Sequence, residues 1–448
     1  MAAKWQQLSV EQIRAPDERS VAIGPFGSRM KADAYVDMGV PVIRGNNISD
    51  TQALTGDFVY VSEETADELR SCNVFPSDLV FPHRGAIGQV GIVPNDGVGR
   101  YMLSTSLMKL TCNRKLVDPE FVFYFFRSGV GRHALLRNAS TVGTPGIGQP
   151  LTSLRAISVP VPALAEQRAI ANILGTLDYK IELSRRMSET LEAMARALFK
   201  SWFVDFDPVR AKAEGRDPGL PKHVADLFPD RLVESELGEI PEGWTVCQLS
   251  DVTEYLSRGI SPAYVETGGI LVLNQKCVRD GQVDWVKGRR HDEQKKGTVN
   301  RRLKVGDVLV NSTGVGTLGR VAQVLWLPED AVVDSHVTVV RAKTLEVSPA
   351  YLGMELRRRE SEIEALGEGS TGQTELSRTR LSALMLIAPT ASVLDCFSRI
   401  VAPLWSRVAL AWRQSEVLSQ IRDALLPKLV SGELRIGEAA RIVEDAVA

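Results

Sequence analysis

The sequence predicts an α+β protein made of two copies of one unit, in which a mixed, largely β domain is followed by a long helix. Short β-rich runs broken by glycine and proline fill most of each copy, among them GVPVIRGNNIS, GDFVYVS and SLMKLTC in the first and GGILVLNQKCV and HVTVVRA in the second. A narrow apolar stripe then follows at steps of three and four residues, the spacing of one helix face. The same stripe occurs twice.

The repeat has an offset of 227 residues along the helical stretch. Pro162 aligns with Pro389, and the register continues without a gap through Leu177 with Leu404. The preceding domains correspond more loosely, because Asp78 aligns with Asp307 at an offset of 229, and surface loops tolerate small insertions. The chain is therefore a tandem duplication. The predicted segments are a first domain over 1–161, a central helix over 162–204, a proline-rich extended linker over 205–244, a second domain over 245–388, a C-terminal helix over 389–431 and a tail over 432–448.

Each long helix is expected to cover its apolar stripe with the other, as in an antiparallel coiled coil. If helical throughout, the first measures roughly 60 Å at about 1.5 Å per residue. Met187 and Met194 belong to its stripe, and Pro403 predicts a break in the second helix near Ala402. The residues expected to pair the helices are Ile170, Ile173, Leu177, Ile181, Leu191, Leu198, Ile400, Leu404, Val408, Leu418, Ile421 and Leu425.

Composition narrows the functional classes. The 448 residues carry a formal net charge of −2, which argues against a protein that grips DNA by charge alone. No apolar run is long enough to span a membrane and the N-terminus lacks a secretory pattern, so we expect a cytoplasmic protein. Five scattered cysteines without a C-x-x-C motif favour neither a disulfide framework nor a zinc ribbon. The tail is expected to be a peripheral helix or partly disordered.

Catalytic motifs are missing from the sequence. GVGTLG at 314–319 fits G-x-G-x-x-G, but a strand-like run follows it where a dinucleotide site needs a helix, so it is interpreted as a glycine-rich turn. The five histidines form no ligand pair, and neither a P-loop nor a nucleophile elbow occurs. We therefore predict no catalytic residue and no metal ligand.

Polar loops recur in both copies. Arginine, asparagine, glutamine, lysine and serine on turns are the side chains that contact base edges and phosphates, although ordinary turn chemistry uses the same residues. A basic stretch over 287–304 is either a solvated face or a phosphate-facing surface. The candidate DNA-binding residues are Ser28, Arg29, Arg44, Asn46, Asn47, His83, Arg84 and Gln89 in the first domain, and Arg258, Asn274, Gln275, Lys276, Asn311, Ser312, Thr313 and Arg320 in the second.

With this layout the chain resembles the specificity subunit of a type I restriction–modification system. The resemblance covers nearly all of the chain and rests on the combination of its parts. These are the helix opening P-x-L-x-E-Q at 162–167, the linker FVDFDPV, and the loops GPFGS, VIRGNNI, SRGISPAY and GDVLVNSTG. The second helix departs from it, since Val393 and Leu394 replace the Glu–Gln pair.

The resemblance implies a subunit without chemistry of its own. Each domain would be a target-recognition domain that reads one half of a split double-stranded DNA site, and the helices would form an antiparallel spacer. The implied partners are two methyltransferase (M) subunits and restriction or motor (R) subunits. No cofactor would bind this chain, whereas the partners would use S-adenosylmethionine, ATP and magnesium. Two alternatives stay open: an enzyme with a site between the two domains, and a coiled-coil adaptor without a DNA role.

Overall fold

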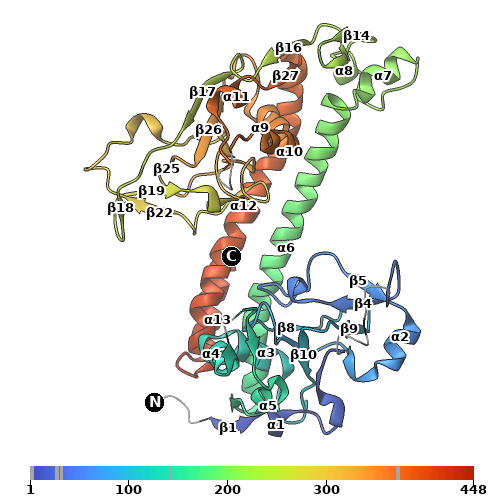
Figure 1. Cartoon of the computed structure of the whole chain (residues 1–448), viewed down its shortest axis with the longest axis vertical. Coiled ribbons are helices and arrows are strands. Elements are labelled where there is room, and N and C mark those ends of the chain that lie inside the picture. Colours follow the sequence, from blue (N-terminus) through green and yellow to red (C-terminus); the bar gives the residue numbers. More distant parts are fainter. Residues whose placement is uncertain (1–4, 26–29, 31–33, 141–142, 370–373, 448) are drawn as a thin grey trace. The chain divides into compact units, whose positions relative to one another are not determined.

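The computed structural model describes residues 5–25, 30, 34–140, 143–369 and 374–447. The chain divides into two compact units (Figure 1). Unit 1 comprises residues 1–186 together with 412–448, and unit 2 comprises residues 187–411. Each unit therefore contains one β-rich domain, half of the first long helix and half of the second.

Unit 1 is built on two small sheets. The first has the strand order β2 (Val21–Ile23), β10 (Leu107–Leu110), β7 (Leu79–Pro82) and β8 (Gly91–Ile92). The second has the order β3 (Tyr35–Val36), β5 (Val59–Val61), β4 (Val40–Ile43), β9 (Tyr101–Leu103) and β6 (Asn73–Val74). Two pairs complete it: β1 (Gln6–Ser9) with β13 (Ser158–Val161), and β11 (Ala139–Ser140) with β12 (Gly146–Ile147).

Helices cover the first sheet of unit 1. One of them is α3 (Pro119–Arg127); Pro119 occupies its first turn, where no backbone N–H is needed, and Asp118 caps it. Its aromatic residues join strands β7 and β10 in one core. The other helices of unit 1 are α1 (Val10–Ile13), α2 (Glu63–Glu68), α4 (Gly129–Leu136), α5 (Pro150–Arg155) and α13 (Ile436–Val447). The tail thus forms a helix, α13, that packs on this core through Ala439 and Val443.

Unit 2 repeats the plan of unit 1. Its first sheet has the order β17 (Thr253–Arg258), β26 (Val337–Ala342), β23 (Val308–Asn311) and β24 (Val321–Gln323). Its second has the order β18 (Tyr264–Val265), β22 (Arg289–His291), β19 (Ile270–Leu273) and β25 (Ala331–Val333). The remaining elements are the pairs β16 (Thr245–Gln248) with β27 (Met385–Ala388) and β20 (Val278–Arg279) with β21 (Gln282–Val283), and the helices α9 (Pro349–Arg358), α10 (Glu360–Ala365) and α11 (Arg378–Ser382). The shared strand order confirms the predicted duplication.

The proline-rich segment after the first long helix is folded, so the expectation of an extended linker is wrong. It contains α7 (Asp207–Ala213), α8 (Lys222–Ala225) and the hairpin of β14 (Leu232–Ser235) with β15 (Gly238–Pro241). Phe206, Phe228 and Trp244 are buried in the core of unit 2. The prolines punctuate short elements, and the aromatic residues between them bury enough apolar surface to hold the segment in place.

The two long helices are α6 (Leu164–Phe203) and α12 (Ala391–Val430). In unit 1 the first half of α6 shares a core with the second half of α12, through Leu177 and Leu418. In unit 2 the end of α6 packs against the start of α12, where the rings of Phe199 and Phe397 are 6.0 Å apart. The beginning of each helix thus packs against the end of the other, as in an antiparallel pair. α12 is helical through Pro403, so the predicted break is wrong; Pro403 is exposed there, and buried neighbours such as Val401 hold the helix.

The predicted apolar stripe is only partly the buried one. It is buried from Ile170 to Ile181, but Met187 and Met194 are 42% and 55% exposed, so the prediction is wrong for these two. The buried positions continue instead through Ser184, Ser188, Glu192, Ala195 and Phe199, in regular steps of three and four. The other predicted pairing residues divide as follows: Leu418, Leu425 and Val408 are buried, Leu191, Leu198, Leu404 and Ile421 are half-buried, and Ile400 is 40% exposed.

This shift gives a testable expectation. Ser188→Asp should lower the free energy of unfolding by at least about 2 kcal/mol, because it places a carboxylate in a buried helix contact. Met187→Asp, one position earlier and exposed, should change it by no more than about 0.5 kcal/mol. Urea unfolding of both full-length variants measures the difference, and equal losses would show that the buried stripe lies elsewhere.

Candidate nucleic-acid interface

In unit 1 two predicted loops lie side by side. The first is the 3-10 helix η3 (Gly45–Asn47), which follows strand β4, and the second is the turn from 83 to 90, which follows β7. A Cβ atom at Gly45 would lie 4.0 Å from that of Ala86. The exposed predicted residues here are Asn46, Arg84 and Gln89. These three side chains are available to a ligand from solvent.

Asn47 holds the first loop together from inside. Its side chain is wholly buried, accepts from the backbone N–H of Arg44 at 2.9 Å and donates to the carbonyl oxygens of Thr55 and Asp57. The side chain of Arg44 is half-buried and donates to the same carbonyl of Asp57 at 2.9 Å. Asn47 was predicted to contact DNA; from this position it cannot, because the loop already uses its amide.

His83 is also a buried residue and not an exposed one. Its Nε2 lies 3.2 Å from the carbonyl oxygen of Thr105, and its backbone carbonyl accepts from Ile147. Burial lowers the pKa of His83, so the imidazole is neutral near pH 7. His83 therefore fixes the base of its loop, which corrects the predicted DNA contact. Ser28 and Arg29 lie outside the described residues.

In unit 2 the equivalent loops are joined directly. The 3-10 helix η5 (Gln275–Cys277) follows β19 as η3 follows β4, and the turn over 311–320 follows β23 as the 83–90 turn follows β7. Asn311 is wholly buried and its amide donates to the carbonyl of Gln275 at 2.9 Å. Ser312 is buried too, with its hydroxyl 2.6 Å from that of Thr338. Both were predicted to contact DNA, and both instead connect strands and loops inside the domain.

The outward residues of this cluster are Lys276, which is exposed, and five half-buried side chains. Arg258 pairs with Glu375 and donates to the carbonyl of Leu376, and Arg320 donates to the carbonyl of Gly316 at 2.8 Å. The Thr313 hydroxyl lies 2.7 Å from His336 Nδ1. Asn274 accepts from the backbone N–H of Lys276, while Gln275 lies half-buried beside Asn311.

Three residues of this cluster were missed by the sequence reasoning. Arg301 donates to the backbone carbonyl of Arg258 at 2.7 Å, and Glu375 and His336 are the partners just described. Arg301 lies in the basic stretch over 287–304, and this stretch was a sequence signal that could have identified it. The rest of that stretch is largely occupied within the domain: Lys287 pairs with Asp284, Arg290 with Glu329, and Arg302 with Asp330.

The G-x-G-x-x-G sequence at 314–319 is a turn that leads into strand β24, as predicted. Among the described residues no group of three or more histidine, cysteine, aspartate or glutamate side chains is arranged to hold a metal ion. In the same part of the chain, no helix has both the length and the hydropathy to cross a bilayer.

Comparison with known proteins finds similar chains that share one description. Residues 27–193 match the family model of the type I restriction modification DNA specificity domain. The chain is 26% identical over 396 residues to the type I restriction enzyme MjaIX specificity subunit of Methanocaldococcus jannaschii, covering 85% of each protein. It is also 26% identical over 393 residues to the HindI specificity subunit of Haemophilus influenzae, covering 78% of this chain and 84% of that one. The relatives that this chain matches over most of its length are thus named as specificity subunits of type I restriction enzymes.

A solved structure shows the same kind of fold. The crystal structure of a type I restriction–modification S subunit from M. genitalium aligns with a TM-score of 0.59 at 13% identity, covering 95% of this chain and 96% of that one. Two β-rich domains, each followed by a long helix, are thus a fold that this chain shares with a solved S subunit.

In unit 1, a buried ionic network lies against the segment that follows the first loop. Asp178 on α6 accepts from Arg422 on α12 and from the Tyr124 hydroxyl on α3, both at 2.8 Å. Arg422 also donates to the backbone carbonyl of Asp50 at 2.7 Å, and Arg185 forms a two-point ion pair with the Asp50 carboxylate. The network joins both helices to the segment that follows η3.

The partners of Arg422 and Asp50 in this network favour their ionised forms, whereas at Asp178 burial outweighs the neighbouring arginines and raises the pKa. Burial alone would lower the pKa of Arg422, but the Asp178 carboxylate raises it. Burial likewise would raise the pKa of Asp50, yet the hydrogen bond and charge of Arg185, with the charges of Arg422 and Arg127, lower it from 3.8 to about 2.

Removing one partner of the buried pair should be costly. We expect Arg422→Met to lower the free energy of unfolding by about 3–5 kcal/mol, because it leaves the Asp178 carboxylate buried without its closest cation. Asp423→Asn removes the exposed partner of the same arginine and should cost no more than about 0.5 kcal/mol. Chemical denaturation of both variants provides the comparison; similar losses would mean that burial of the pair is unimportant.

The Asp50 ion pair predicts a pH dependence. Since its folded-state pKa lies below the ordinary value, its stabilising effect is fully present above about pH 4 and is lost as the pH falls toward 2. The difference in unfolding free energy between the wild type and Asp50→Asn should therefore be constant from pH 7 to about 4.5 and shrink below that. A difference that grows on acidification would contradict the assignment.

Proposed function

We propose that this chain is the DNA-reading subunit of a type I restriction–modification complex, and that each of its two domains reads one half of a split target. The observation that supports this most is the equivalence of the two loop clusters. η3 and η5 follow corresponding strands, and the 83–90 and 311–320 turns do as well. The exposed side chains at these equivalent places differ, so the two half-sites should differ in sequence.

Within the clusters, buried and exposed positions have separate tasks. Asn47 and Cys277 are equivalent, buried, and accept from the backbone N–H three residues earlier, at 2.9 Å and 3.5 Å. The residues just before them, Asn46 and Lys276, are exposed. An amide suits adenine and a lysine suits guanine or phosphate, so these two positions are the best candidates for base contacts.

The partners of the chain follow from the same proposal. The chain would hold two M subunits and recruit R subunits. In support, the similar MjaIX and HindI proteins are named as specificity subunits of type I restriction enzymes. S-adenosylmethionine would serve adenine methylation by the M subunits, and ATP and magnesium would serve the R subunits. This chain would contribute the sequence recognition and the scaffold and would need no cofactor itself.

The test is the methylation pattern of the assembled complex. Mapping methylated adenines in DNA treated with the chain and its M subunits should give one two-part motif with an unread interval. Asn46→Ala should relax one half and Lys276→Ala the other, since losing a base contact costs about 1–3 kcal/mol of discrimination. Lys304→Ala, an exposed lysine of the basic stretch, is the matched control and should leave the motif unchanged.

Two outcomes would contradict the proposal. A continuous motif would refute reading by two separate domains. A single substitution that alters both halves would refute the division of labour between the loop clusters.

A further inference from the structure

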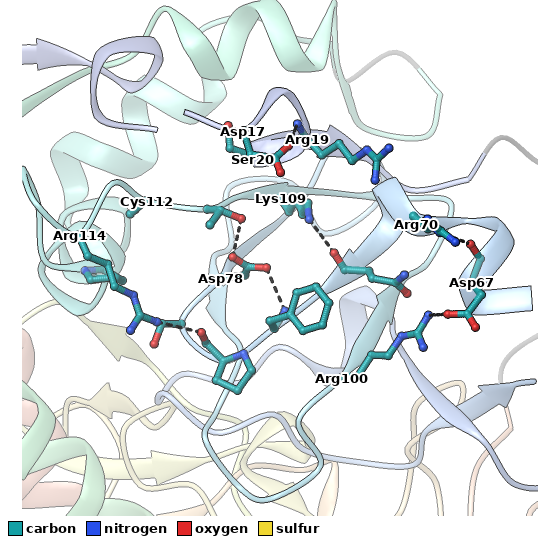
Figure 2. A pocket seen from close by; sticks show the side chains of 16 residues that line it. Asp17, Arg19, Ser20, Asp67, Arg70, Asp78, Arg100, Lys109, Cys112 and Arg114 are labelled. Atoms are coloured by element: carbon teal, nitrogen blue, oxygen red, sulfur yellow. Dashed lines mark hydrogen bonds and ion pairs between the residues drawn. The ribbon is translucent and has the colours of Figure 1, made fainter. Parts of the chain in front are cut away.

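Unit 1 contains a cavity of about 680 Å³ (Figure 2). Its lining residues include none of the predicted DNA-binding residues. It is next to Asp78, at the start of strand β7, whereas His83 and its loop follow the other end of that strand. Five cationic side chains and three carboxylates line it: Arg19, Arg70, Arg100, Lys109 and Arg114 against Asp17, Asp67 and Asp78. The volume is within the range of small-molecule sites.

A buried lysine stands in the cavity wall. Lys109 on β10 is 5% exposed, and its ammonium donates to the backbone carbonyl of Asn73 at 2.6 Å. An ammonium has three protons to donate, so one such bond leaves capacity for a ligand. The Asp78 carboxylate does not compete for it at close range, because its oxygens accept from the Thr111 hydroxyl at 2.6 Å and the Phe75 backbone at 2.9 Å.

The same wall carries an acceptor without a donor. The Asn73 side chain is buried and its amide nitrogen donates to the carbonyl of Ala66 at 2.8 Å, which fixes its orientation. Its Oδ1 is buried and has no hydrogen-bond partner within the described part of the chain. A buried carbonyl oxygen left in this state costs free energy, and a hydroxyl or N–H group brought into the cavity would satisfy it.

In unit 2 an arginine side chain occupies the position equivalent to this part of the cavity. Leu110 pairs with Leu79 and Val340 pairs with Val308, so the next residues, Thr111 and Arg341, occupy equivalent positions. Arg341 makes a two-point bond to Asp307, at 2.6 and 2.8 Å, and also donates to the backbone carbonyl of Arg302.

One arginine in unit 2 thus does the work that unit 1 divides between two residues. Thr111 bonds the aspartate and Lys109 bonds the neighbouring carbonyl, and the residue equivalent to Lys109 is the buried Val339. The short threonine leaves open in unit 1 the space that the guanidinium takes in unit 2.

The turn at the rim of the cavity also differs between the two units, and here too unit 1 has the additional polar group. Ser77 lines the cavity with a φ of 75°, a left-handed conformation that costs free energy in any residue with a Cβ. The equivalent residue in unit 2 is Gly306, with a φ of 97°, where no such cost arises. Unit 1 keeps a hydroxyl at a strained position that glycine would relieve, and this hydroxyl adds a polar group to the wall.

We propose that this cavity binds a small phosphate ester that also carries hydroxyl or amino groups. Lys109 would bind the phosphate, with Arg19, Arg70 and Arg114 as further cations, since charge-assisted bonds to phosphate are the strongest such a site can make. A hydroxyl or amino group of the ester would donate to Asn73 Oδ1. Burial lowers the pKa of Lys109 and raises that of Asp78, and a bound anion would favour the charged ammonium.

Calorimetric titration of the full-length chain tests this with ribose 5-phosphate, inorganic phosphate and ribose as probes. Ribose 5-phosphate should bind with one site per chain, inorganic phosphate several-fold more weakly because it cannot fill the cavity, and ribose not measurably. The double variant Lys109→Val and Thr111→Arg copies the closed arrangement of unit 2 and should weaken binding at least about tenfold. Lys115→Met, an exposed lysine nearby, is the control and should bind as the wild type does.

Circular dichroism and the melting temperature of the double variant check that it folds. A second variant, Arg70→Ala, changes an exposed residue at the rim of the cavity and leaves the core intact; it should weaken binding a few-fold. No heat of binding with millimolar ribose 5-phosphate, or unchanged binding by the folded double variant, would overturn the proposal. Competition by a short duplex DNA would identify a backbone phosphate as the source of the ester, and lack of competition would identify a free molecule. The methylation motif is unaffected by either result, so this site and the DNA-reading function are tested separately.

Discussion

The buried contact between Asp178 and Arg422 is the constraint on which unit 1 depends. A carboxylate and a guanidinium removed from water are tolerated only when they meet each other with good geometry. Here that requirement fixes α6 against α12, and Tyr124 adds α3 to the same carboxylate. Because Arg422 also bonds the backbone of Asp50, the first predicted DNA loop leads into a segment held by both helices.

Unit 2 solves the same docking problem with different chemistry. Arg127 at the end of α3 approaches Asp178 at 3.6 Å, and the equivalent Arg357 on α9 pairs with Glu192 on α6 at 3.0 Å. At the end of α6 the helices meet through aromatic rings, with the Phe203 ring 4.9 Å from that of Phe397 and 5.0 Å from that of Tyr351. A polar network in one copy and an aromatic cluster in the other perform the same task, so the duplicated helices need not be interchangeable.

The sequence was sufficient to predict the architecture, but not to predict which face of the first long helix is buried along its whole length. The repeat at an offset of 227 residues and the β-rich runs bounded by glycine and proline are patterns that extend over many residues, and these survived the divergence of the copies. The stripe failed at Met187 and Met194, because the middle of the buried face consists of Ser184, Ser188 and Glu192. A rule that follows apolar side chains cannot find a contact made by small and paired polar ones. The helix break predicted at Pro403 failed for a similar reason. The packing of α12 outweighs the low helix propensity of a single proline.

The candidate interface was predictable as a set of loops, though not residue by residue. Polar residues on turns serve either the ligand or the loop itself, and only burial separates the two. The separation has a consequence for how such a protein changes its target. Asn47 and Cys277 keep their loops closed from inside, while the neighbouring Asn46 and Lys276 point outward without a part in loop closure. Since exposed substitutions away from such bonds cost little stability, the outward positions can change freely on an unchanged loop. The two copies in this chain differ in that way: their loops have the same backbone arrangement and different exposed side chains.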